Sequence, residues 1–198
     1  MVRRLLVATT NRDKVREIRS LLEGSPVDLI TLNEIAPVAE PEETGTTFEE
    51  NARLKARYYA AHSGMLTVAE DSGLVIDTLD GEPGVKSARF LRPDASYPER
   101  FAAIFERLAH HPERPRTARL VCAVAVDEGD AIVFETTGTI EGSIAQIPAG
   151  SRGFGYDPIF FYPPYRATLA EVSEDDKLAV AHRGQAFRAL AHWIGESR

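Results

Sequence analysis

The chain has 198 residues, of which 43% are hydrophobic and 27% are charged, as is usual for a globular protein. Its formal net charge of −7 argues against a nucleic-acid polymer as partner, because such a polymer requires a broad basic face. A small phosphorylated ligand needs only a few local cations, so this charge does not exclude one.

The composition also indicates whether the chain spans a membrane and which redox compartment suits it. No apolar run reaches the ~18 residues of a membrane-spanning helix, so we expect no membrane partner. Cys122 is the only cysteine, which excludes an intramolecular disulfide and a thiolate metal cluster. We therefore expect a reducing, cytoplasmic location, with Cys122 buried as a small hydrophobic residue.

The first third of the chain alternates between strand and helix patterns. Residues 4–9 are apolar and β-branched and predict a strand. Apolar residues at helical spacing follow over 15–22, after Asn and Thr residues that suit a helix N-cap, and Gly24 ends this helix. A second strand over 27–32 closes a β-α-β unit.

The next segment contains a loop, a helix and an unusual apolar run. Residues 33–45 are rich in proline and acids and predict a loop. Thr47 to Glu50 form a capping box, which predicts a helix that ends near His62. Residues 68–76 are apolar except for a charged break at 70–73, so we predict two strand segments that meet there.

The remaining patterns are regular. They predict a helix over 98–110, strands over 119–127, 131–144 and 159–162, a glycine-rich loop over 148–158, a short helix capped by Ser173, and a last helix from His182 to about Ile194. No repeat, linker or low-complexity tract divides the chain. We therefore expect one α/β domain over residues 1–198, with a mixed sheet.

The charged break is the first candidate for chemistry. Burying a carboxylate costs free energy unless a partner or a metal compensates its charge. Acids in the middle of a buried strand therefore need an explanation. On an extended backbone, Glu70 and Asp71 point to opposite faces, so one could hold a divalent cation while the other orients it or activates a water. The alternative is a surface hairpin, in which Asp-Ser-Gly is ordinary turn chemistry.

Two further segments carry cations. The strand-to-helix turn from Thr9 to Lys14 would aim N–H groups and a lysine at a phosphate; the alternative is a capped helix with a solvated lysine. Asn51 and Lys55 are four residues apart and share one helix face, where Lys55 could serve a phosphate or pair with a glutamate.

The last two candidates lie near the C-terminus. Phe154 stands between two glycines and is read as a stacking platform with Asp157 as a nearby acceptor; the alternative places Phe154 in the core. Lys177, His182 and Arg183 are potential cations around a helix start, where acids are preferred. Cations at this end of a helix oppose its dipole, and no structural benefit is visible in the sequence. Such an exception points to a functional role.

In this order, seven short segments resemble the inosine triphosphate pyrophosphatase family, the noncanonical purine nucleoside triphosphate pyrophosphatases. The resemblance covers essentially the whole chain and rests on Thr9-x-Asn11-x-x-Lys14, Glu42-Glu43-Thr44-Gly45, Phe48-x-Glu50-Asn51, Glu70-Asp71-Ser72-Gly73, Pro83-Gly84 with Ser87-Ala88-Arg89-Phe90, Phe154-Gly155-Tyr156-Asp157-Pro158, and Lys177 with His182-Arg183-Gly184. Two positions depart from the family: Thr10 stands where many relatives have Gly, and Glu70 replaces a commoner Asp.

The resemblance implies a fold and a set of roles. It implies an elongated central mixed sheet flanked by helices, with two lobes around a substrate cleft, in a homodimer. Asp71 would be the general base and a ligand of one Mg²⁺ per subunit, with Glu43 and Glu70 completing or supporting that site. The triphosphate would be bound by Thr9, Thr10, Asn11, Arg12, Asp13 and Lys14. Lys55 and Ser72 would also contact the substrate. The base would be held by Phe154, Gly155, Tyr156, Asp157, Lys177, His182 and Arg183.

The implied reaction is Mg²⁺-dependent hydrolysis of inosine, deoxyinosine and xanthosine triphosphates (ITP, dITP and XTP). A water activated by Asp71 would attack the α-phosphorus and release a nucleoside monophosphate and pyrophosphate. Two alternatives stay open: a nucleotide sensor without turnover, and the related pyrophosphatase class that acts on modified pyrimidine nucleotides.

Overall fold

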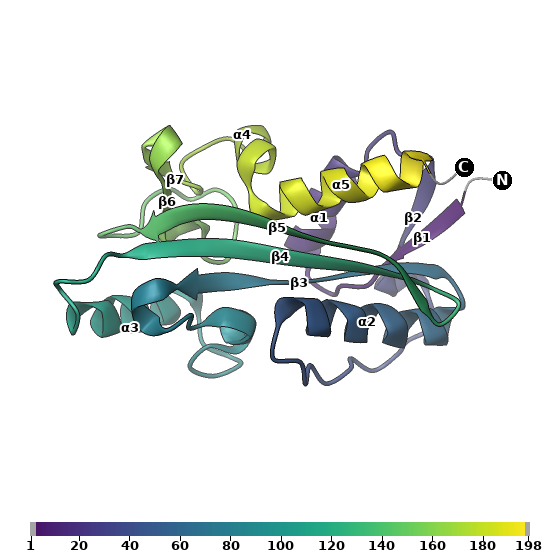
Figure 1. Ribbon diagram of the computed structural model, residues 1–198, viewed down its shortest axis with the longest axis horizontal. Coiled ribbons are helices and arrows are strands. Elements are labelled where there is room, and N and C mark those ends of the chain that lie inside the picture. Colours follow the sequence, from purple (N-terminus) through teal and green to yellow (C-terminus); the bar gives the residue numbers. More distant parts are fainter. Residues whose placement is uncertain (1–2, 197–198) are drawn as a thin grey trace. The chain divides into compact units, whose positions relative to one another are not determined.

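The computed structural model describes residues 3–196 and shows a mixed α/β fold (Figure 1). In this part of the chain, seven strands form one sheet in the order β2-β1-β3-β4-β5-β6-β7. The strands are β1 (Arg3–Val7), β2 (Val27–Thr31), β3 (Leu66–Ile76), β4 (Thr117–Glu128), β5 (Ala131–Ile144), β6 (Phe160–Tyr162) and β7 (Ala167–Thr168). The α-helices are α1 (Arg12–Leu21), α2 (Phe48–Ser63), α3 (Tyr97–Ala109), α4 (Glu174–Val180) and α5 (His182–Glu196). The predicted fold class is confirmed.

The predicted β-α-β unit is present. Strand β1 pairs in parallel with β2 and also with β3. The side chain of Asn11 caps α1 by accepting the backbone N–H groups of Asp13 and Lys14. The capping box at Thr47 and Glu50 starts α2, and Gly64 ends it in the left-handed conformation. Local sequence therefore determines where both helices begin.

The charged break at 70–73 is not a break, and the predicted meeting of two strand segments is wrong. Strand β3 runs without interruption from Leu66 to Ile76, through both acids. Glu70 and Asp71 are 3% and 6% exposed, so the surface hairpin is excluded as well. The strand can continue because each carboxylate finds cationic partners, which are described with the candidate site.

Most of the other expected elements are also present. The patterns over 98–110, 119–127 and 131–144 correspond to α3, β4 and β5, and Ser173 caps α4. The prediction omits β7, which has two residues and pairs with β6 in antiparallel fashion, because so short a strand has no periodicity. No helix in the described range is long and apolar enough to cross a bilayer.

The chain divides into two compact units. The first contains residues up to 71, residues 122–138 and residues from 182 onward, and the second contains residues 72–121 and 139–181. In the first unit, α1 and α5 cover apolar side chains of β1, β3 and β4, among them Leu5, Val68 and Val124. In the second, residues of α3 such as Ile104 pack with Leu74 and Phe160. The single domain and the substrate cleft stay predictions.

Gly138 lets α5 approach the sheet of the first unit closely. A Cβ atom at this position would lie 2.1 Å from the carbonyl oxygen of His182 and 2.9 Å from the backbone nitrogen of Ala186. Backbone atoms cannot give way as a flexible side chain can. A glycine in β5 therefore sets the height at which His182 and Arg183 sit over the sheet.

We predict that Gly138→Ala lowers the free energy of unfolding by about 1–3 kcal/mol, the usual cost of overpacking. Gly195→Ala is the matched control, because a Cβ at this position in α5 would meet nothing within 4 Å. Chemical denaturation of both variants checks the prediction. Equal stability of the two variants would contradict it.

Candidate active site around Glu70 and Asp71

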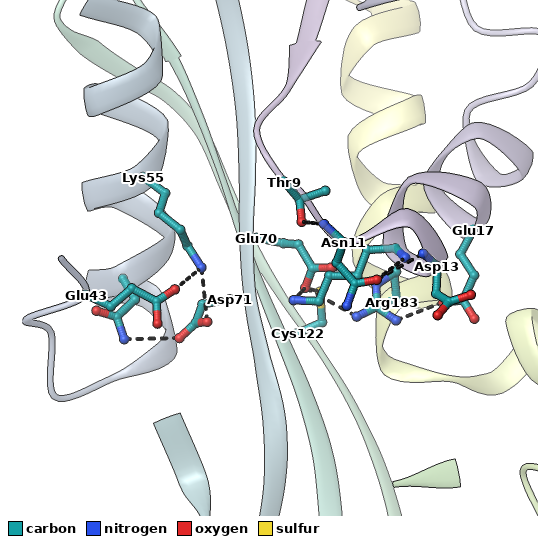
Figure 2. A network of polar contacts seen from close by, with 12 residues as sticks. Thr9, Asn11, Asp13, Glu17, Glu43, Lys55, Glu70, Asp71, Cys122 and Arg183 are labelled. Atoms are coloured by element: carbon teal, nitrogen blue, oxygen red, sulfur yellow. Dashed lines mark hydrogen bonds and ion pairs between the residues drawn. The ribbon is translucent and has the colours of Figure 1, made fainter. Parts of the chain in front are cut away.

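The alternation of β3 separates the two acids, as predicted for an extended backbone. Figure 2 shows Asp71 on one side of the β3 ribbon with Lys55 and Glu43, and Glu70 on the other side with Cys122 and Arg183. All these residues belong to the first unit. Each acid therefore has its own set of partners.

Asp71 is held by two residues of α2. The side-chain amide of Asn51 donates to Oδ2 of Asp71 at 3.1 Å, and Nζ of Lys55 donates to Oδ1 at 3.2 Å. The same ammonium group donates to Oε1 of Glu43 at 2.6 Å. The spacing of four residues places Asn51 and Lys55 on one helix face, so a single turn of α2 positions both contacts.

Asn51 also fixes the loop that carries Glu43. Its Oδ1 accepts the backbone N–H of Gly45 at 2.8 Å, and its side chain is fully buried. A Cβ atom at residue 45 would lie 2.6 Å from that oxygen, so the contact requires glycine there. Asn51 is absent from the predicted site residues, although its position one turn before Lys55 is the signal that could have identified it.

Burial controls the charge of this cluster. It raises the pKa of Asp71, and the nearby charge of Lys55 opposes that shift only in part. Burial also lowers the pKa of Lys55, but the charges of Asp71 and Glu43 outweigh it, so this pKa lies above its usual value. Lys55 therefore stays an ammonium group, whereas Asp71 becomes a stronger proton acceptor than an exposed aspartate.

The donors near Asp71 fit Mg²⁺ chemistry. Within residues 3–196, no group of three or more His, Cys, Asp or Glu side chains is arranged to hold a metal. Mg²⁺, however, keeps several waters and is commonly bound by one or two carboxylates plus substrate phosphates. Glu43 and Asp71 share the Lys55 ammonium and meet that requirement. The structure does not bring Glu70, the third predicted ligand, to this pair.

Glu70 instead belongs to a buried ion network. Nε of Arg183 donates to Oε1 of Glu70 at 2.8 Å, and Nη1 donates to Oε2 of Glu17 at 2.8 Å. Cys122 is fully buried, as expected, and its Sγ donates to Oε2 of Glu70 at 3.3 Å. Lys14 lies 3.5 Å from the same oxygen.

This network changes the interpretation of the cations at the start of α5. Arg183 opposes the helix dipole, but the buried carboxylates of Glu17 and Glu70 compensate its charge. The position of this arginine therefore has a structural explanation that the sequence pattern does not reveal. Glu17, which is 1% exposed, is not among the predicted site residues. Its position one turn after Lys14 on α1 is the signal that could have identified it.

Two side chains of the predicted phosphate-binding turn form hydrogen bonds within the chain. Oγ1 of Thr9 accepts the backbone N–H of Asn11 at 3.2 Å, and Thr10 donates to Glu40 at 2.8 Å. Lys14 lies in the first turn of α1, as expected, whereas the side chain of Asp13 pairs with Arg16. Asn11 and Arg12 are exposed. The phosphate contacts of this turn stay a prediction.

The predicted base-binding loop lies in the second unit. Oδ2 of Asp157 accepts the backbone N–H of Phe154 at 2.9 Å and Nζ of Lys177 at 2.8 Å. That ammonium group lies 5.0 Å from the centroid of the Phe154 ring. Phe154 is partly exposed, so the alternative that buries it in the core is excluded. Asp157 accepts from groups of its own chain here, and its predicted role as an acceptor for a bound base stays a prediction.

The other predicted substrate-binding residues do not form one cluster. Tyr156 is buried and its hydroxyl donates to the carbonyl oxygen of Ser87 at 2.8 Å, while Gly155 adopts a φ of +66°. Ser72 is partly exposed in β3. His182 is buried at the start of α5 in the first unit. The structure therefore groups Phe154, Asp157 and Lys177 and pairs Arg183 with carboxylates; the base contacts stay a prediction.

Comparison with known proteins gives one consistent family. A family model described as the Ham1 family matches residues 5–193. A dITP/XTP pyrophosphatase of Exiguobacterium sp. is 45% identical over 187 residues, covering 94% of each chain. A solved HAM1 protein from Coxiella burnetii has a TM-score of 0.92 at 37% identity, covering 98% of this chain and 100% of that one. The Ham1 protein of Staphylococcus aureus has a TM-score of 0.89 at 32% identity, covering 99% and 100%. The resemblance found in the sequence is confirmed.

We predict that Arg183→Met lowers the free energy of unfolding by about 3–5 kcal/mol, because it leaves Glu17 and Glu70 buried without their shared partner. Arg53→Met is the matched control, since Arg53 pairs with Glu135 at the surface, where such pairs contribute little. Urea denaturation measures both variants. An equal, small loss in both would show that the buried network contributes nothing.

Proposed function

This chain belongs to the Ham1 family, and we propose that it is a nucleoside triphosphate pyrophosphatase acting on noncanonical purine nucleotides. Its substrates would be ITP, dITP and XTP, and its products a nucleoside monophosphate and pyrophosphate. Relatives that are 45% and 42% identical are named dITP/XTP pyrophosphatases, which supports this substrate class. The observation that carries the proposal is the desolvated Asp71 carboxylate, placed beside Glu43 and Lys55.

The residues around Asp71 suit attack of water on a phosphate. Asp71 would accept a proton from the attacking water, because burial raises its pKa toward the working range of a general base. Lys14 and Lys55 would bind phosphate oxygens as point charges. Glu43 and Asp71 would hold Mg²⁺, which neutralises phosphate charge when bound. Catalysis of this kind consists mainly of positioning and electrostatic stabilisation.

Selection of the base would come from hydrogen-bond donors. Hypoxanthine and xanthine carry an oxygen at C6, where adenine carries an amino group. Lys177 and the backbone N–H groups around Gly153 and Gly155 would face that oxygen and oppose an amino group. Guanine also has the C6 oxygen, so it would be rejected at C2, by crowding or by a further donor. One buried donor left unpaired costs about 1–3 kcal/mol, or roughly 5- to 150-fold in preference.

Incubation with a nucleotide panel and Mg²⁺ tests the proposal. We expect ITP, dITP and XTP to release pyrophosphate without orthophosphate, and ATP and GTP to react far more slowly. Asp71→Asn should fold and lose about a hundredfold or more in kcat, in line with loss of a positioned base and metal ligand. Nucleotide binding without turnover would favour the nucleotide sensor. A preference for modified pyrimidine nucleotides would favour the related pyrophosphatase class.

A second variant separates phosphate binding from base recognition. Lys14→Ala should lower kcat/KM for ITP and ATP by similar factors, because phosphate contacts position a ligand without identifying its base. The fold should survive, since Glu70 keeps Arg183 as its partner. A large change in the ratio of kcat/KM for ITP and ATP would place Lys14 at the base instead.

The remaining expectations concern assembly and compartment. We propose a homodimer in the cytoplasm, as the family resemblance implies. Light scattering during size-exclusion chromatography measures the mass in solution, and a monomer at working concentration would contradict the first part of this proposal.

A further inference from the structure

The ammonium group of Lys55 occupies the oxygens that the proposed metal site would use. Its Nζ contacts Oε1 of Glu43 at 2.6 Å and Oδ1 of Asp71 at 3.2 Å (Figure 2). The side chains of Lys55 and Asp71 are only 13% and 9% exposed. Two carboxylates this close would repel each other strongly out of water, and a lysine relieves that repulsion.

The two contacts of Asp71 with α2 differ in kind, since one comes from a buried amide and the other from a lysine. Asn51, fully buried and bound to Gly45, holds Oδ2 of Asp71. Lys55 holds Oδ1 through a flexible four-carbon side chain that can turn while Asn51 keeps the carboxylate in place. If Lys55 leaves, it therefore frees one oxygen of Asp71 and one of Glu43 together, while Asn51 still holds Oδ2 of Asp71.

We propose that Lys55 is a resident counter-cation for Glu43 and Asp71 that competes with the divalent metal. Before nucleotide binds, Lys55 holds the two carboxylates and weakens their affinity for free Mg²⁺. When a triphosphate brings its own negative charge, Lys55 turns to a phosphate oxygen, and Glu43 and Asp71 would then be able to hold the metal. This inference rests on the proposed function, and it implies that metal enters together with nucleotide.

Metal binding to the nucleotide-free protein tests the proposal without reference to turnover. Isothermal titration with Mg²⁺, and electron paramagnetic resonance with Mn²⁺, measure the dissociation constant of wild type and of Lys55→Met. Removal of one positive charge at contact distance should tighten binding by about tenfold or more. Lys55→Gln is a second neutral variant, should the methionine variant fail to fold.

Three further variants test whether tighter metal binding comes from the loss of the Lys55 charge. Lys55→Arg keeps the charge, and Lys86→Met removes an exposed lysine of the second unit, so both should bind metal as wild type does. The double variant Lys55→Met with Asp71→Asn should lose the gain, because it lacks one of the two carboxylates.

Three results would overturn the proposal. These are equal or weaker metal binding in the neutral variants, a gain in Lys55→Arg as large as that in Lys55→Met, and a gain that survives Asp71→Asn. Release of pyrophosphate from ITP by the wild-type preparation is recorded beside the titrations. Failure of that reaction would count against the proposed function, whereas normal turnover without the metal effect would count against the role of Lys55 alone.

Discussion

Two adjacent carboxylates, Glu70 and Asp71, lie buried in one continuous strand. A carboxylate out of water must be compensated, and the two-residue period of a strand sends Glu70 and Asp71 to opposite faces. The protein therefore supplies cations on both faces of β3. Arg183 from α5 serves Glu70, and Lys55 from α2 serves Asp71.

The two faces differ in what they can do. On one face, Arg183 is enclosed by Glu17 and Glu70 in a buried network with Cys122, which suits a structural role. On the other face, Lys55 is shared by two carboxylates, and burial raises the pKa of Asp71. That arrangement suits exchange of a lysine for a metal and transfer of a proton. A single dipeptide thus links the stability of the first unit to its proposed chemistry.

Local signals predicted a large part of this structure. The N-cap at Asn11, the capping box at Thr47 and the opposite orientation of Glu70 and Asp71 all follow from the sequence near them. The predicted interruption of the strand at 70–73 is wrong because the partner that compensates Glu70 lies 113 residues away, beyond any local pattern. The helical spacing pairs Asn51 with Lys55 and Glu17 with Lys14, but their partners Asp71 and Arg183 lie 20 and 166 residues away, so only the fold shows these contacts.

The unfolding free energies of Glu70→Gln and Asp71→Asn, measured side by side, test the separation of roles most directly. We expect Glu70→Gln to be destabilised by about 3–5 kcal/mol, because Arg183 loses part of its buried compensation. Asp71→Asn should change stability by less than about 1 kcal/mol, because it removes a charge that burial disfavours. Equal losses in the two variants, or a larger loss in Asp71→Asn, would show that Glu70 and Asp71 do not have separate roles.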